Sequence, residues 1–214
     1  ALTLNFNHNA TCEVNMYTDN CRILVIDTET TGLFVNGVDE YDFRQPYPVQ
    51  IAAALFDIRE EGYQWQLNHL VKIPAEAALD PKSVEIHRIS REMTEINGVT
   101  PLSVYKEIRD MARTAEAVTA YNIEFDERII RTSSVRMYPG VFDDDPVMGD
   151  PVKQFCAMKF CQPLFKQPRQ KLDQVYKRLF GVSITDAHDA MADVLATADV
   201  LRALMRHVMS STEN

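Results

Sequence analysis

The chain has 214 residues, enough for one ordinary domain that folds around its own hydrophobic core. Hydrophobic residues make up 46% and charged residues 25%, which argues against a disordered chain, a collagen and a coiled coil. No run approaches 18 uninterrupted apolar residues, so we expect no membrane span, and residues 1–20 lack the basic start and apolar core of a secretory signal. A cytoplasmic protein is the expectation.

The net charge of -9 argues against a protein that coats nucleic acid by charge alone. The charge is uneven, however, because residues 131–180 hold nine Lys or Arg against five Asp or Glu. This segment contains the sequence KQPRQK at 166–171. Such a run is more often a solvated loop, and it becomes a phosphate contact only if other features point to nucleic acid.

Four cysteines are too few for a disulfide scaffold, and none of them form a C-x-x-C pair. A zinc site would need Cys12 and Cys21 to meet Cys156 and Cys161 across the fold, with spacings that do not suit zinc. We therefore expect reduced thiols.

The first half of the chain predicts a sheet. Residues 22–29 form a short apolar run that ends in carboxylates and a Thr-Gly turn, which predicts a buried strand. Residues 48–58 and 63–73 flank Glu60-Glu61-Gly62, so we expect them to be the next two strands of an antiparallel meander.

After Pro81 the apolar spacing becomes helical, at Val84, Ile86, Ile89, Met93 and Ile96. A second helix is expected at 103–115, then a strand at 117–122, a helix at 123–134 and an acidic surface loop at 137–151. FCAMKFCQ at 155–162 and KLDQVYKRLFG at 171–181 follow, and the last long helix is expected at 190–208. This order predicts an α/β domain, a mixed sheet covered by helices, over 22–209, with an N-terminal extension at 1–21 and a tail at 210–214.

Asp27 and Glu29 stand two residues apart at the end of the first predicted strand, and the two-residue period of a strand puts both carboxylates on one face. Two acids that end an apolar strand are a candidate Mg²⁺ site. Alone, such a pair more often marks a strand end whose second acid points to solvent.

Three more residues extend this pattern. Asp126 falls in the first turn of a predicted helix, where the helix dipole favours negative charge. His188 and Asp193 are five apart, a spacing that turns through about 140° on a helix, so we place His188 on the loop or first turn that leads into the last helix. Taken singly, an aspartate such as Asp126 more often serves only as a dipole partner, and a histidine such as His188 more often caps a helix or lies on the surface.

Together these residues resemble the three motifs of the DEDDh, DnaQ-like 3′-to-5′ exonucleases. DTETTGL at 27–33 resembles the first motif, and YNIEFDERII at 121–130 resembles the second, with Tyr121 in place of the commoner His. The third is H-x4-D at 188–193. EIHRIS at 85–90 is similar to the family's I-H-G-I element, with Arg88 in place of Gly, and 171–182 resembles the helix before the third motif. The resemblance spans about residues 22–208.

The resemblance implies an RNase H-like fold with a mixed five-stranded sheet, and hydrolysis that releases nucleoside 5′-monophosphates with two divalent cations, Mg²⁺ or Mn²⁺. It implies that Asp27 bridges both ions, that Glu29 and Asp193 hold the ion carrying the attacking water, and that Asp126 serves the second ion. His188 would take the proton from the water, a task that suits a group titrating near neutral pH. Four converging carboxylates would repel one another without such cations.

The substrate implied is a single-stranded nucleic-acid 3′ end. Thr30, Thr31, Gly32 and Leu33 would contact the terminal nucleotide, and His87 would help to enclose its base. Gly32 equally fits a turn glycine, and His87 a helix-surface histidine. The further expected contacts are Asn122, Lys166, Arg169 and Lys171, with Phe34 or Tyr121 stacking on bases.

The sequence leaves several alternatives open. We expect DNA ends, with RNA or short oligoribonucleotides as the nearest alternative, because no residue that reads the 2′-OH is identified. An inactive nucleic-acid-binding or polymerase-binding module and a domain that binds cations for structure are the other readings. The chain is expected to be either a stand-alone enzyme or a separate subunit that works with a polymerase or another replication or repair partner. The oligomeric state is left open.

Overall fold

In the computed structural model, the described residues are 4–5, 11–12, 21–165 and 169–212. The expected extension at 1–21 lies mostly outside this part, and so does Lys166. Its described pieces are β1 (Leu4–Asn5) and β2 (Thr11–Cys12), which pair antiparallel.

Five strands form the central sheet: β3 (Arg22–Thr30), β4 (Pro48–Asp57), β5 (Trp65–Leu70), β6 (Ala117–Ala120) and β7 (Gln154–Cys156). Their order is β5-β4-β3-β6-β7. β3, β4 and β5 form the expected antiparallel meander, whereas β6 and β7 run parallel to β3. The predicted mixed five-stranded sheet is therefore confirmed.

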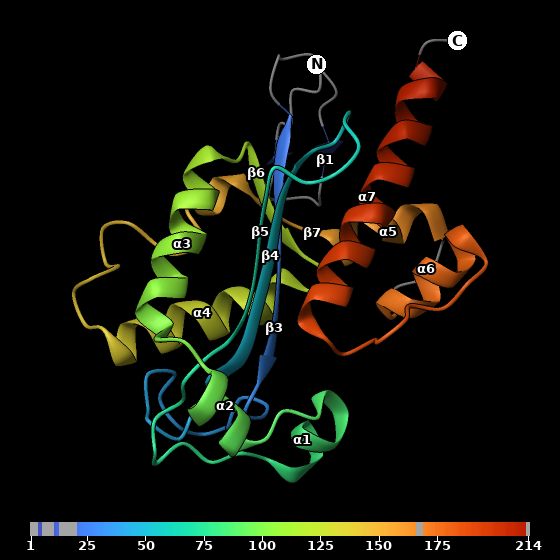
Figure 1. Cartoon of the computed structure of the whole chain (residues 1–214). Coiled ribbons are helices and arrows are strands. Elements are labelled where there is room, and N and C mark those ends of the chain that lie inside the picture. The colour runs from blue at the N-terminus through green and yellow to red at the C-terminus, as the bar shows by residue number, and fades with distance from the viewer. Residues whose placement is uncertain (1–3, 6–10, 13–20, 166–168, 213–214) are drawn as a thin grey trace.

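Helices cover both faces of this sheet (Figure 1). α3 (Pro101–Thr114) and α4 (Ile123–Met137) lie on one face, and α7 (Ala190–Thr212) lies on the other with α5 (Ala157–Phe165) and α6 (Leu172–Phe180) beside it. Because both faces are covered, β4 is buried along its whole length. The last helix ends at Thr212, so the tail expected from residue 210 is partly helical.

The alternation of β3 separates two cores. Leu24 and Ile26 pack into the core on the side of α3 and α4, whereas Ile23 and Val25 pack into the core on the side of α7. Asp27 and Glu29 continue the second series, and Thr28 continues the first. The expectation that the two carboxylates share one face is therefore confirmed, and that face is the one covered by α7.

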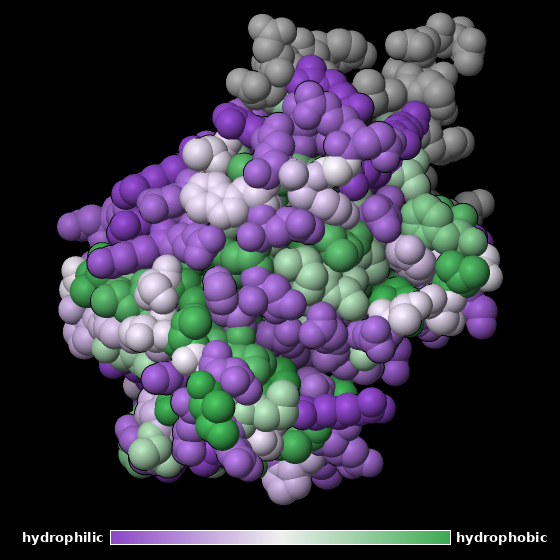
Figure 2. Space-filling model, in the orientation of Figure 1, coloured by the Kyte–Doolittle hydropathy of each residue, from purple (hydrophilic) through white to green (hydrophobic). Residues whose placement is uncertain are grey.

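The helical run expected after Pro81 is two short helices, α1 (Pro81–His87) and α2 (Arg91–Asn97), separated where Arg88 adopts φ 61°. Ile86 is 54% and Ile96 70% exposed, so their helical spacing does not mark a core-facing stripe. Figure 2 shows apolar side chains exposed at this end of the molecule, and further apolar patches across the middle of the same face.

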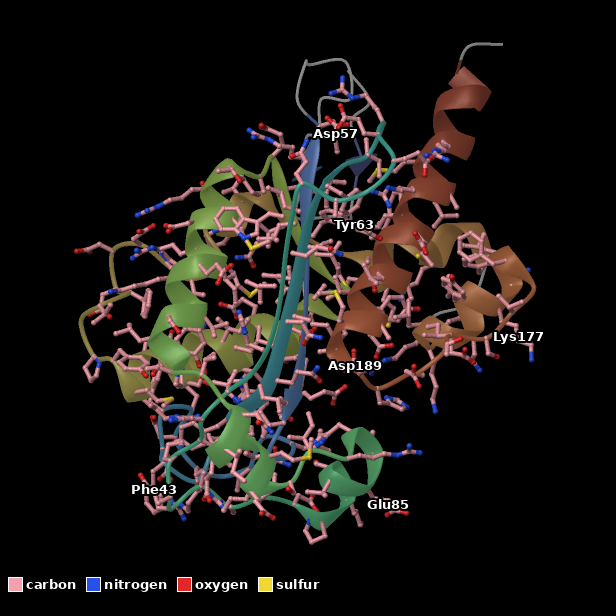
Figure 3. The ribbon with its side chains drawn as sticks, in the orientation of Figure 1. Phe43, Asp57, Tyr63, Glu85, Lys177 and Asp189 are labelled. Carbon is pink, nitrogen blue, oxygen red and sulfur yellow. The ribbon has the colours of Figure 1, made fainter. Side chains whose placement is uncertain are left out.

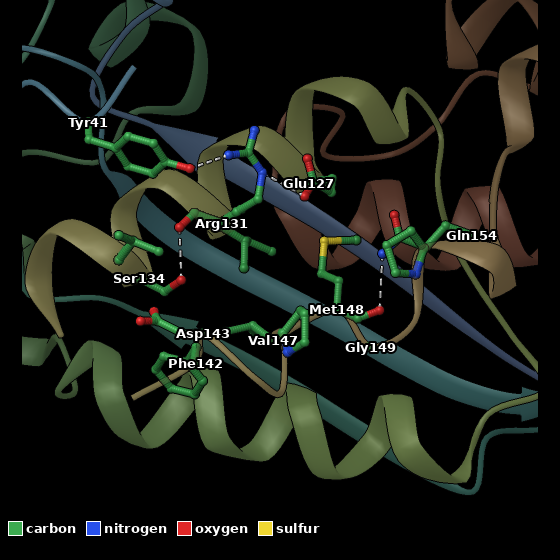
Figure 4. A pocket seen from close by; sticks show the side chains of 14 residues that line it. Tyr41, Glu127, Arg131, Ser134, Phe142, Asp143, Val147, Met148, Gly149 and Gln154 are labelled. Carbon is green, nitrogen blue, oxygen red and sulfur yellow. Dashed lines mark hydrogen bonds and ion pairs between the residues drawn. The ribbon is translucent and has the colours of Figure 1, made fainter. Parts of the chain in front are cut away.

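The acidic segment 137–151 is a loop with mostly exposed or half-buried residues, as predicted, and three of its residues also anchor it in the core. Phe142, Val147 and Met148 are buried in the core formed with α3 and α4, and the Phe142 ring meets Tyr105 edge-on at 6.0 Å between centroids. With α4 the segment encloses a cavity of about 370 Å³, at whose rim Arg131 donates a hydrogen bond to the Tyr41 hydroxyl at 2.8 Å (Figure 4). A short 3-10 turn, η1 (Pro151–Lys153), then leads into β7.

The start of α7 is fixed to the sheet by two side chains. Asp189 Oδ1 accepts hydrogen bonds from the backbone N–H groups of Met191 at 3.1 Å and Ala192 at 3.2 Å. Gln50 of β4 donates through Nε2 to Asp189 Oδ2 at 2.9 Å and accepts through Oε1 from the N–H of Ala190 at 3.2 Å. Since Gln50 is the register partner of Glu29, these bonds set the first turn of α7 beside that carboxylate.

Three cysteines with described side chains, Cys21, Cys156 and Cys161, are buried free thiols, as expected. In the part of the chain that the structure describes, none of the helices is both long and apolar enough to cross a bilayer.

Replacing Asp189 by alanine should lower the free energy of unfolding by about 1 kcal/mol, because α7 loses its N-cap acceptor. Asp189→Asn should keep most of this stability, since asparagine caps helices about as well. Urea unfolding of both variants measures the difference, and equal losses for the two would contradict the capping role.

Phe142→Ala should lower the free energy of unfolding by about 3 kcal/mol, because it empties a buried aromatic site between the 137–151 segment and α3. The neighbouring Val141, which is exposed, provides the matched control Val141→Ala. Guanidinium unfolding would count against the anchoring role if both variants lost the same stability.

Candidate active site

Carboxylates from three elements converge at one end of the sheet. Asp27 and Glu29 come from β3, Asp126 from the first turn of α4 and Asp193 from the first turn of α7. Burial, and secondly the charges of the other carboxylates, raise the pKa of Asp27 well above its usual range and that of Glu29 to about 8. Burial also raises the pKa of Asp193. The charges of Asp126, Asp193 and Glu29 all contribute to the raised pKa of Asp27, so the four carboxylates lie near one another.

Asp126 is buried and held by the strand that carries the first two acids. Its Oδ1 accepts hydrogen bonds from the Thr28 backbone N–H at 3.0 Å and from the Thr28 hydroxyl at 2.8 Å. Burial raises the pKa of Asp126 to about 7, although the two bonds from Thr28 act in the opposite direction. The predicted place of Asp126 in the first turn of a helix is confirmed.

Glu29, His188 and Asp193 each offer one ligand atom, and these atoms lie within 4.8 Å of one another. His188 precedes α7 on the connecting loop, as expected, and its backbone has φ 73°. Two carboxylates and an imidazole at such separations suit a divalent cation, so the residues present fit a metal.

Sequence reasoning missed a fifth carboxylate, Asp189. Figure 3 labels it at the start of α7, and its charge raises the pKa values of Asp27, Glu29 and Asp193. The signal was available, because an aspartate directly before a helix is a preferred N-cap. The partner Gln50 gave no comparable signal in the sequence.

His87 is buried, which corrects the alternative of a helix-surface histidine. Its Nδ1 accepts from the Ile89 N–H at 3.0 Å, so its proton is on Nε2, which donates to the Thr30 carbonyl at 3.1 Å. Burial lowers the pKa of His87 and favours this neutral form. The ring thus fixes the backbone at the end of β3, and it lines a cleft of about 740 Å³ together with His188 and Asp189.

The segment after β3 is shaped by internal bonds. The Thr30 hydroxyl donates to the Gly32 carbonyl at 2.8 Å, and the Thr31 hydroxyl accepts from the Tyr47 N–H at 3.0 Å. Gly32 is not in the left-handed region, so positive φ does not explain it. Leu33 is 78% exposed and is free to contact a ligand.

A second cleft, of about 800 Å³, brings together Asn122, Arg169, Lys171, His188 and Asp193. The predicted contacts Asn122, Arg169 and Lys171 therefore line the same cleft as His188. Tyr121 also lines this cleft, but its hydroxyl donates to the Gln170 carbonyl at 2.8 Å. Phe34 is stacked under the Arg128 guanidinium, 3.9 Å from its ring centre.

The family model for exonucleases of the RNase T type matches residues 24–201. A comparison with curated proteins finds no match.

Solved exonuclease structures share the fold. Escherichia coli exonuclease I in complex with a dT13 oligonucleotide has a TM-score of 0.67 and 17% identity, over 90% of this chain and 43% of that chain. Exonuclease I from Methylocaldum szegediense has a TM-score of 0.64 and 20% identity, over 87% and 40%. The nuclease domain of 3′hExo, a DEDDh family member bound to rAMP, has a TM-score of 0.64 and 13% identity, over 89% and 94%.

The chain therefore spans less than half the length of the exonuclease I chains that it matches. These likenesses confirm the RNase H-like fold. With the family model matching nearly the whole described domain and the five motif residues gathered in one site, the chain belongs to the RNase T exonuclease family, in its DnaQ-like DEDDh branch.

Proposed function

We propose that this exonuclease shortens single-stranded DNA from the 3′ end, and that residues 22–209 form its catalytic domain. The observation that carries the proposal is the convergence of Asp27, Glu29, Asp126 and Asp193 next to His188. The products would be nucleoside 5′-monophosphates.

The carboxylates support two divalent cations, Mg²⁺ or Mn²⁺, because the charge that they concentrate needs neutralisation. Asp27 would contact both ions, Glu29 and Asp193 the ion nearer His188, and Asp126 the other. Bound there, such a pair would stabilise the attacking and leaving oxygens of a displacement at phosphorus. Thr28 keeps Asp126 oriented through its two hydrogen bonds.

His188 would remove the proton from the attacking water. Its side chain is exposed at the meeting point of the two clefts and lies near Glu29 and Asp193. An imidazole suits this step because its charge changes near neutral pH. The Gln50–Asp189 link holds the helix that follows His188, and so limits the movement of the loop.

The bound strand would place its terminal nucleotide against Thr30, Thr31, Gly32 and Leu33, and its backbone along Asn122, Arg169 and Lys171. His87 would act by holding Thr30. DNA is the proposed substrate and RNA is the alternative. Among the similar structures, one of exonuclease I contains dT13 and one of 3′hExo contains rAMP. A polymerase or repair partner stays a prediction.

A 5′-labelled DNA oligomer incubated with Mg²⁺ or Mn²⁺ should give a ladder that shortens from the 3′ end, and EDTA should abolish it. Asp27→Asn should remove detectable cleavage, and His188→Ala should lower kcat by about 10² to 10⁴-fold. Glu60→Gln, in the exposed turn after β4, is the matched control and should cleave normally. The same-sequence RNA run in parallel identifies the preferred substrate.

Binding without a ladder from either oligomer would overturn the nuclease proposal in favour of an inactive binding module. Cleavage that persists in EDTA would overturn the part played by the cations. Metal-stabilised folding with neither binding nor cleavage would favour a purely structural cation site.

The metal-free protein should become less stable as the pH rises from about 5 to about 8. Unfolded carboxyls ionise near pH 4, whereas Glu29 and Asp126 have pKa values of about 8 and about 7 in the fold. In this window the folded state binds more protons, so the free energy of unfolding falls with increasing pH.

Thermal melting in EDTA across this pH range measures the effect. Mg²⁺ or Mn²⁺ should raise the melting temperature most at pH 8, where the carboxyls are ionised. Asp126→Asn should flatten the pH dependence. A metal-free melting temperature that increases from pH 5 to pH 8 would show that the carboxyls do not repel one another as described.

A further inference from the structure

Three non-glycine residues in the described part of the chain have a left-handed backbone: Arg88 with φ 61°, Asp186 with φ 57° and His188 with φ 73°. All three line the same cleft, the one between the end of α1 and the start of α7. Non-glycine residues rarely adopt this conformation, and such strain gathers at functional sites. His188 belongs to the candidate active site, and the same backbone conformation at Arg88 and Asp186 indicates that these residues also have a role in this cleft.

Arg88 stands where the backbone favours glycine. It ends α1, and its N–H donates to the Val84 carbonyl at 2.7 Å in the left-handed C-terminal turn that glycine adopts most easily. Glycine would make the same backbone bond without a Cβ penalty. Helix termination therefore does not account for an arginine at this position.

The Arg88 side chain is available to a ligand. It is exposed and has no ion pair or side-chain hydrogen bond with any of the described residues. The exposed Arg131, by contrast, is paired with Glu40. Among the described residues that line the cleft, Arg88 is the one permanent cation, because His87 is held in its neutral form.

The charge of the cleft explains what this cation would do. Asp186 and Asp189 line the same cleft, and the carboxylates of the site lie beyond His188, so the surface repels a polyanion. Arg169 and Lys171 line the neighbouring cleft, which shares Ala187 and His188 with this one. Cations therefore line both of the clefts that meet at His188.

We propose that Arg88 binds a phosphate of the single strand that runs past His188, with its guanidinium donating two hydrogen bonds to non-bridging oxygens. The inference rests on the proposed function to the extent that the ligand is a nucleic acid. It adds a residue that positions the strand on the α1 side of the cleft, opposite Arg169 and Lys171.

The test compares Arg88→Gly, Arg88→Lys and the control Lys106→Ala, which removes one positive charge from the exposed surface of α3. The dissociation constant of a fluorescein-labelled DNA oligomer is measured by anisotropy in EDTA over a range of salt concentrations, so binding is followed without metal-dependent turnover. KM and kcat are then measured with Mg²⁺, and the melting temperature of each variant is recorded.

Arg88→Gly should raise the dissociation constant and KM by at least about tenfold, since a charged hydrogen-bonding contact is lost. The dependence of log K on log salt should flatten by about 0.7. Its melting temperature should stay the same or rise, because glycine relieves the strained backbone. Arg88→Lys should keep the salt dependence while losing part of the affinity, and Lys106→Ala should match the wild type.

Wild-type affinity and salt dependence in Arg88→Gly would overturn the inference, and so would a lower melting temperature with unchanged binding, which marks a purely structural residue. If the protein binds DNA but cuts nothing, the nuclease proposal fails while Arg88 is still tested. If the wild type neither binds an oligomer in EDTA nor cleaves one with Mg²⁺, both proposals fail.

Discussion

The repulsion between carboxylates at the end of β3 is the constraint on which the rest of the site depends. Asp27 and Glu29 face α7 because of the two-residue period of the strand, and the intervening Thr28 faces the opposite core. That single alternation does two things, since Thr28 then reaches Asp126 with both its N–H and its hydroxyl. One strand thus supplies two acids directly and orients a third on the other side of the sheet.

Holding like charges together requires rigid elements, and the contacts around the site are of that kind. Gln50 hydrogen-bonds β4 to the first turn of α7, and His87 hydrogen-bonds α1 to the end of β3. The Gln50 and His87 side chains are neutral, and each of them both donates and accepts a hydrogen bond. Neutral links suit this place, because a cation there would pair with the carboxylates and compete with metal ions for them.

Sequence reasoning located the local features and missed those that depend on tertiary pairing. The strand with Asp27, the helix with Asp126 and the loop position of His188 follow from short-range pattern. The link from Gln50 to Asp189 joins residues 139 apart and needs the register of β4 against β3, which no local pattern fixes. The single helix expected after Pro81 was wrong because exposed Ile86 and Ile96 mimic a buried stripe, and the left-handed break at Arg88 has no glycine to announce it.

Asp189 shows how stability and function share one residue. Its Oδ1 caps α7 and its Oδ2 binds Gln50, so the fold gains from an acceptor at this position. An asparagine could cap the helix too, yet the charge of the aspartate also raises the pKa of Asp27 and Glu29. A fifth negative charge destabilises the site without cations and stabilises the site with cations bound. The residue that fixes α7 therefore also strengthens the demand of the site for divalent ions.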